Sequence, residues 1–137
     1  MARKVRKVNY FAMNVSNRPG QAARVLEVFA QDGVNLLAFT GFPNGRGAQM
    51  DFIPENTAEF VAAARRAKLG VKPKKQGFLI QGDDQPGAIA DVMMKLAATK
   101  INVTAVDAVC AGKGRYGAIL WVKAKDVSKA AKTLHAA

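Results

Sequence analysis

Apolar residues recur at helical spacing in two separate stretches of this chain, and each stretch follows a short run of strand-forming residues. In both stretches the apolar positions fall at i, i+3, i+4 and i+7, which places them on one face of a helix. We therefore expect two amphipathic helices with matching faces. These faces comprise Ala22, Val25, Leu26 and Phe29 in the first helix and Ile89, Val92, Met93 and Leu96 in the second.

The remaining pattern predicts the same order of elements in both halves of the chain. Runs of β-favouring residues precede and follow each helix, a Gly-basic-Gly loop then predicts a hairpin, and an Ala-rich amphipathic stretch ends each half. The order is strand, helix, strand, strand, helix. The expected elements are strands at 8–15, 33–39 and 49–53 with a helix at 57–67, and strands at 77–82, 100–106 and 116–122 with a helix at 126–135.

One shift of 67 positions, the separation of Pro19 and Pro86, aligns the two halves without a gap. Such self-similarity at a fixed period identifies an internal repeat. We interpret the chain as a tandem duplication with units at 1–72 and 73–137. The matched pairs are Phe11 and Phe78, Gly20 and Gly87, Val25 and Val92, Asn35 and Asn102, Ala38 and Ala105, Gly45 and Gly112, and Gly47 and Gly114.

The element order predicts an α+β fold of two ferredoxin-like βαββαβ units, each an antiparallel sheet with helices on one face. Residues 70–72 would supply a short last strand to the first unit, whereas the second unit has no residues left for one. An unpaired sheet edge favours pairing with another chain. We expect either a homodimer that covers this edge or a long first strand, 5–15, that compensates for it.

The composition adds few constraints on function. Half of the residues are hydrophobic, enough for a core, and no apolar run approaches the roughly 20 residues that span a bilayer, so we expect a soluble cytoplasmic protein. The net charge of +11 is divided almost equally between the halves and is typical of a solvated surface. With one cysteine, Cys110, and one histidine, His135, the sequence predicts no metal site, no Cys/His dyad and no cofactor.

The turn before each predicted helix carries the most informative motif. Residues 17–20 read Asn-Arg-Pro-Gly and residues 84–87 read Asp-Gln-Pro-Gly, and each helix is followed by an Asn, in 33–35 and in 100–102. Ser16, Asn17, Asp83 and Asp84 are residue types that cap helix N-termini. A helix start leaves unpaired N–H groups that can hold a carboxylate, and a glycine there permits close backbone approach.

These motifs resemble the signature of ACT domains, the regulatory amino-acid-binding modules of many metabolic enzymes. The resemblance covers the whole chain as two tandem units, apart from the missing last strand, and the second copy is looser. It implies a free-standing regulatory protein, not an enzyme, that binds an amino acid between units and forms a homodimer. The ligand-binding residues that it implies are Asn17, Arg18, Pro19, Gly20, Asn35, Leu36, Asp84, Gly87 and Asn102.

Three alternatives remain beside this interpretation. The same turns could serve folding alone, in a protein-interaction module that binds no ligand. Paired RNA-recognition domains share the strand and helix order, but Ala118 stands where their motif needs a stacking ring. An enzyme is disfavoured because the carboxylates of the first half show neither metal-ligand spacing nor a Ser/His partner.

Overall fold

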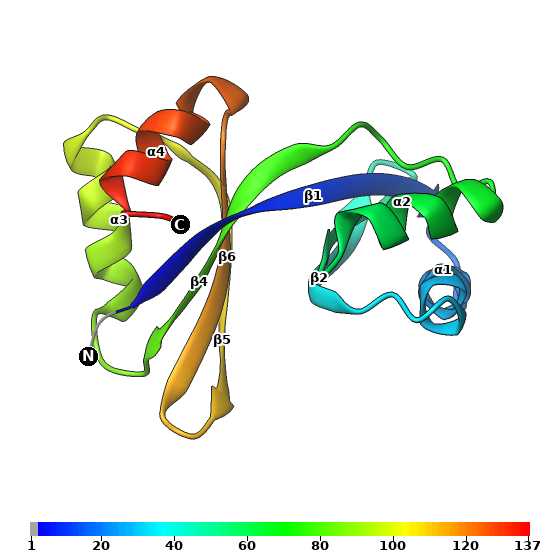
Figure 1. The fold of residues 1–137 in the computed structure, drawn as a ribbon, viewed down its shortest axis with the longest axis horizontal. Helices are drawn as coiled ribbons and strands as arrows, with labels where there is room; N and C mark the ends of the chain where they lie inside the picture. The colour runs from blue at the N-terminus through cyan, green and yellow to red at the C-terminus, as the bar shows by residue number, and fades with distance from the viewer. Residues whose placement is uncertain (1–2) are drawn as a thin grey trace. The chain divides into compact units, whose positions relative to one another are not determined.

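The structure, a computed structural model, describes residues 3–137 and divides into two compact units (Figure 1). The first unit is Asn9–Lys75. The second is Gln76–Ala137 together with the N-terminal residues up to Val8. The start of the chain, which the sequence placed in the first unit, thus contributes to the second.

The first unit contains a three-stranded antiparallel sheet of order β2-β3-β1, in which Phe52 of the central strand lies opposite Phe39 on one side and Phe11 on the other. Helices α1 and α2 pack on one face of this sheet (Figure 1). Its elements are β1 (Lys4–Ser16), α1 (Gln21–Gln31), β2 (Leu36–Asn44), β3 (Gly47–Pro54) and α2 (Thr57–Arg66).

Phenylalanines form the core of the first unit. The ring of Phe60 stacks on Phe29 with centroids 4.4 Å apart and on Phe11 at 4.8 Å, and Phe52 lies 5.4 Å from both Phe29 and Phe60. Such aromatic pairs stabilise beyond the area that they bury. The strand and helix faces predicted from apolar spacing therefore meet, except at Ala22, which is exposed.

The second unit repeats this arrangement with the order β1-β4-β6-β5, in which only the N-terminal part of β1 takes part. Its core joins alternate residues of β4 and β6 to one face each of α3 and α4. The elements are β4 (Lys75–Asp83), α3 (Ala88–Ala98), β5 (Val103–Gly112), β6 (Arg115–Val122), η1 (Ala124–Asp126) and α4 (Val127–Thr133). The fold is thus α+β, with the ferredoxin-like pattern present twice.

The two units complete their sheets differently. In the first, Val71 forms a single bridge with Met13, and the Lys72 N–H donates to the Ala12 carbonyl at 2.8 Å. The short last strand expected at residues 70–72 is thus present only as an isolated bridge at Val71. In the second, β1 occupies the place beside β4: Val5 is only 4% exposed within that unit's core, and Ala137 exchanges backbone hydrogen bonds with Val5 and Lys7. The long first strand therefore compensates for the missing last strand.

The starts of α1 and α3 correct one prediction. The N-cap residues are Gly20 (φ +87°) and Gly87 (φ +81°), and neither helix has a side-chain cap. Ser16 and Asp83 instead end strands, and Asn17 and Asp84 lie in the turns. The turn needs a left-handed residue directly before the helix, which favours glycine over a capping side chain. Within the described residues, no helix is long and apolar enough to cross a membrane.

Candidate functional site

Each unit has a pocket between the start of its first helix and its edge strand. We call them the first-unit pocket, of about 380 Å³, and the second-unit pocket, of about 390 Å³. The shift that aligns the repeat also aligns the pockets. Eight lining pairs match: Asn17 and Asp84, Arg18 and Gln85, Gln21 and Ala88, Ala22 and Ile89, Gly41 and Ala108, Phe42 and Val109, Pro43 and Cys110, and Gln49 and Tyr116.

Topology explains the location of both pockets. A strand leads up to the turn, the helix runs back down, and the next strand returns in the original direction. The C-terminal end of β2 therefore lies beside the N-terminus of α1, and β5 lies likewise beside α3. The pocket walls come from chain segments about 20 residues apart in sequence.

The first-unit pocket presents hydrogen-bond donors and positive charge. The N–H groups of Ala22 and Ala23, in the first turn of α1, have no hydrogen-bond acceptor among the described residues, and that turn has no acidic residue. The helix dipole adds partial positive charge at this end. Arg18 is exposed, its Nε donating to Ser16 Oγ at 3.3 Å, and no carboxylate lines the pocket. An anionic group is the complementary guest.

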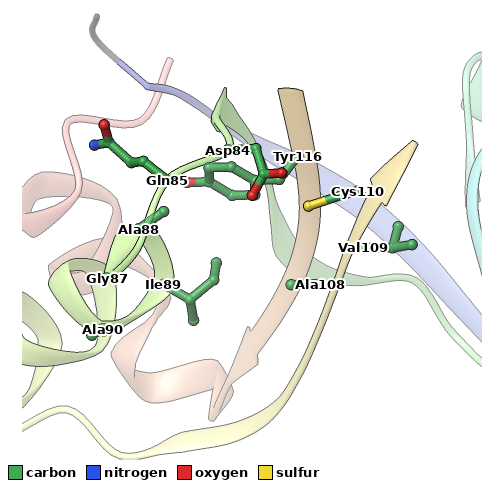
Figure 2. A pocket seen from close by; sticks show the side chains of 10 residues that line it. All are labelled: Asp84, Gln85, Gly87, Ala88, Ile89, Ala90, Ala108, Val109, Cys110 and Tyr116. Carbon is green, nitrogen blue, oxygen red and sulfur yellow. The ribbon is translucent and has the colours of Figure 1, made fainter. Parts of the chain in front are cut away.

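The second-unit pocket has a different polar end. Figure 2 shows the side chains of Asp84, Cys110 and Tyr116 gathered there, while Gln85 points away. The Cys110 thiol donates a hydrogen bond to the Asp84 carboxylate, and this bond, with a smaller contribution from burial and from the Asp84 charge, raises the pKa of the thiol. The Asp84 N–H donates a hydrogen bond to the Gly114 carbonyl at 2.8 Å.

Ion pairs lie next to the second-unit pocket. Asp91, in the first turn of α3, pairs with Arg3 at 2.5 Å, and that hydrogen bond is the main cause of the lowered pKa of Asp91. Arg115 pairs with Asp83 at 2.8 Å. Burial raises the pKa of Tyr116. The two pockets thus share a shape and a place in the fold but differ in charge, with Arg18 in one and Asp84 in the other.

The structure brings some of the sequence-predicted residues together and separates others. Asn17 and Arg18 line the first-unit pocket and Asp84 and Gly87 line the second, while Pro19 and Gly20 lie in the turn next to the first. No described pocket is lined by the predicted residues that follow the helices. These are Asn35, Leu36 and Asn102.

The helix length explains that separation. Asn35 follows the C-terminus of α1, and an 11-residue helix is about 16 Å long, so Asn35 and Asn17 lie at opposite ends of it. The Asn35 carbonyl accepts the Glu55 N–H at 2.9 Å and joins the start of β2 to the end of β3.

Sequence reasoning missed the walls that the edge strands provide, among them Phe42, Pro43, Val109 and Cys110. The sequence contained the information to predict these walls, because the βαβ order places the end of the second strand beside the start of the helix. Among the described residues, no group of three or more His, Cys, Asp or Glu side chains is placed to hold a metal ion.

No family model matches this chain, and neither does any curated protein. Solved structures do resemble it. Protein BT0572 from Bacteroides thetaiotaomicron superimposes with a TM-score of 0.83 at 18% identity, over 96% of this chain and 88% of that one. The ligand-free regulatory subunit of aspartate kinase from Thermus thermophilus gives 0.65 at 19%, over 98% and 93%. Aspartate kinase from Clostridium acetobutylicum gives 0.60 at 14%, over 98% of this chain and 33% of that enzyme. These likenesses confirm the predicted ACT-like fold, and they show the fold alone.

Proposed function

We propose that this chain is a regulatory protein without catalytic activity that binds a free amino acid in the first-unit pocket. The observation that carries the proposal is the combination of Arg18 with the unpaired N–H groups at the start of α1 in a pocket without a carboxylate. Likeness of fold to a regulatory subunit of aspartate kinase supports a regulatory role.

Each part of an amino acid has a complementary group in this pocket. The carboxylate is bound by the guanidinium of Arg18 and by the N–H group of Ala22, which line the pocket, and by that of the adjacent Ala23. The amide of Asn17 offers an oxygen to the ammonium and an NH₂ to the carboxylate. Phe39 and Phe42 on the edge strand supply an apolar wall for the side chain. Asn35, Leu36 and Asn102 remain predictions for a site formed with a second copy of the chain.

The repeat provides the substitutions that test this proposal. Arg18→Gln and Asn17→Asp introduce the residues found at the equivalent positions 85 and 84. Melting temperature is measured for each protein against the twenty amino acids. A ligand at 100 times its dissociation constant stabilises by about 2.7 kcal/mol, so the midpoint rises by several degrees. We expect a selective rise in the original protein and its loss in Arg18→Gln.

Arg24→Gln is the matched control, because Arg24 is exposed on α1, directly after the turn that holds Arg18, but does not line the pocket. It should retain the full response. An equal loss of response in Arg24→Gln and Arg18→Gln would show that net charge, not the pocket, is responsible. A flat response in the original protein would reject the proposal.

A protein-interaction module of the same fold is the second candidate. Edge strand β2 exposes two aromatic side chains, Phe39 at 37% and Phe42 at 44%, and exposed apolar groups on an unpaired edge favour association. We also propose that the homodimer expected from the sequence pairs through this edge. Sedimentation equilibrium measures the oligomeric state. If the protein is a monomer at high concentration and still responds to an amino acid, the homodimer is rejected and the proposal of an amino-acid sensor is retained.

A further inference from the structure

A third pocket lies within the first unit, between α2 and the segment that follows it, and shares no residue with the two pockets described above. Its volume is about 260 Å³. We call it the basic-rimmed pocket. Its floor presents the half-buried side chains of Val61, Leu69 and Val71 above the buried rings of Phe11 and Phe60, and its rim contains Arg65, Lys72 and Lys74.

The floor of this pocket is apolar and rigid. Phe60 is fully buried and Phe11 nearly so, and their stacked rings belong to the aromatic core of the unit. These rings support the aliphatic side chains of α2 and of residues 69–71, which form the apolar surface that a ligand can reach. Burial of an apolar ligand body against this floor would contribute about 25 cal/mol for each Å² removed from water.

The rim of this pocket carries positive charge only. No carboxylate lines the pocket, and none of the three rim cations forms a salt bridge with a described residue. The adjacent Arg66 differs, since it pairs with Asp32 at 2.7 Å. The rim cations are therefore available to an anion from solution.

Backbone hydrogen bonds hold the basic segment beside the floor. The Leu69 N–H donates to the Ala64 carbonyl at 3.0 Å, and the Lys72 N–H donates to the Ala12 carbonyl at 2.8 Å. Pro73 follows and limits the backbone directly before Lys74. The cations are thus placed by the fold and not by a free loop.

The second unit shows what covers the equivalent apolar surface. Phe78 and Val127 are the repeat equivalents of Phe11 and Phe60, and both lie in the core cluster that also buries Val5 from the start of the chain. In the second unit β1 lies beside β4 and contributes Val5 to this cluster. In the first unit the equivalent place beside β1 holds only the single bridge of Val71, and Val71 lines the pocket.

We propose that the basic-rimmed pocket binds a small amphipathic carboxylate, such as a short fatty acid or an arylalkanoic acid. The apolar body lies on the aliphatic floor and the carboxylate lies between Arg65, Lys72 and Lys74. This site is separate from the amino-acid pocket and does not depend on it.

Calorimetric titration of the whole protein with four probes tests both halves of the recognition. Octanoate carries body and anion, octanol carries the body alone, acetate carries the anion alone, and octylamine reverses the charge. We expect measurable binding of octanoate only, at least about tenfold tighter than of the other three and weaker at high salt because the rim is exposed.

Two variants locate the binding. The triple variant Arg65→Gln, Lys72→Gln, Lys74→Gln should bind octanoate about tenfold more weakly or worse. The control variant Lys113→Gln, Lys125→Gln, Lys129→Gln removes as many exposed charges from the second unit and should bind as the original does. Arg18→Gln should also leave octanoate binding unchanged, which separates this site from the proposed amino-acid site.

Three results would overturn the proposal. They are no octanoate binding, equal affinity for octanol, and equal weakening in the two triple variants. Circular dichroism of both triple variants establishes that each is folded, which their exposed positions lead us to expect. If octanoate fails while an amino acid binds, only the basic-rimmed pocket is rejected.

Discussion

Gly20 and Gly87 hold the same left-handed backbone conformation directly before α1 and α3. No atom lies within 4 Å of the place where a Cβ would be at either position. Close approach of the backbone to a ligand, the reason expected for these glycines, stays a prediction, and the space that it needs is open. The positive φ is the requirement, since L-residues with a Cβ adopt it at a cost.

Gly20→Ala should lower the free energy of unfolding by about 1 to 2 kcal/mol, because alanine is strained at this φ. Urea denaturation measures the change. Gly70→Ala is the matched control: Gly70 has equally open surroundings and no positive φ, so it should be neutral or slightly stabilising. Equal destabilisation by both substitutions would contradict the conformational explanation.

Cys110 provides a second test at the scale of single residues. Its hydrogen bond to Asp84 raises the pKa of the thiol, so at neutral pH less thiolate is present than in an ordinary exposed cysteine. The thiolate is the reactive form. Asp84→Asn should lower the pKa towards its usual value and accelerate alkylation of Cys110 by iodoacetamide at neutral pH.

The rate of alkylation as a function of pH measures this shift directly. Asp107→Asn, on the same strand as Cys110, removes a carboxylate that does not perturb the thiol and should leave the profile in place. A profile that is unchanged in Asp84→Asn would show that the carboxylate does not control this thiol.

At the scale of elements, strand β1 has two roles. Its C-terminal part pairs with β3 in the first unit, whereas its N-terminal part neighbours β4 and buries Val5 in the second. A 13-residue strand is long compared with the usual five or six residues. The length allows one element to serve both sheets.

Val5→Ala should destabilise the protein by about 2 kcal/mol, since it removes buried apolar atoms and leaves a space in the second core. Lys4→Ala, at the exposed neighbouring position, should change stability by less than about 0.5 kcal/mol. Urea denaturation compares them. A neutral Val5→Ala would contradict the assignment of the first strand to the core of the second unit.

At the scale of the whole molecule, the two units share the fold and differ in their pockets. Core positions kept their apolar character, as in Phe11 and Phe78, because any polar group there would lose its hydration. Pocket positions changed charge, from Arg18 to Gln85 and from Asn17 to Asp84. Surface positions beside a pocket carry no such packing constraint, so the two units can serve different ligands.

The sequence by itself determined the repeat, the order of elements and the apolar faces of the helices, because these depend on local periodicity. Val25, Phe29, Val92 and Leu96 are all buried, as their spacing predicted. The turn motif was also visible, although its glycines proved to be caps and its polar residues did not. Part of the candidate site followed from that motif, namely Asn17, Arg18, Asp84 and Gly87.

Only the tertiary structure decided which distant residues share a pocket. Three features join residues that are far apart in sequence. They are the edge strands that complete both repeat pockets, the rim of cations beside Phe11 and Phe60, and the place of Val5 in the second unit. The sequence could not distinguish a dimer from the long first strand as the cover of the open edge. Backbone pairing between distant strands depends on how the chain folds back on itself, and the local propensity of a segment does not specify those long-range contacts.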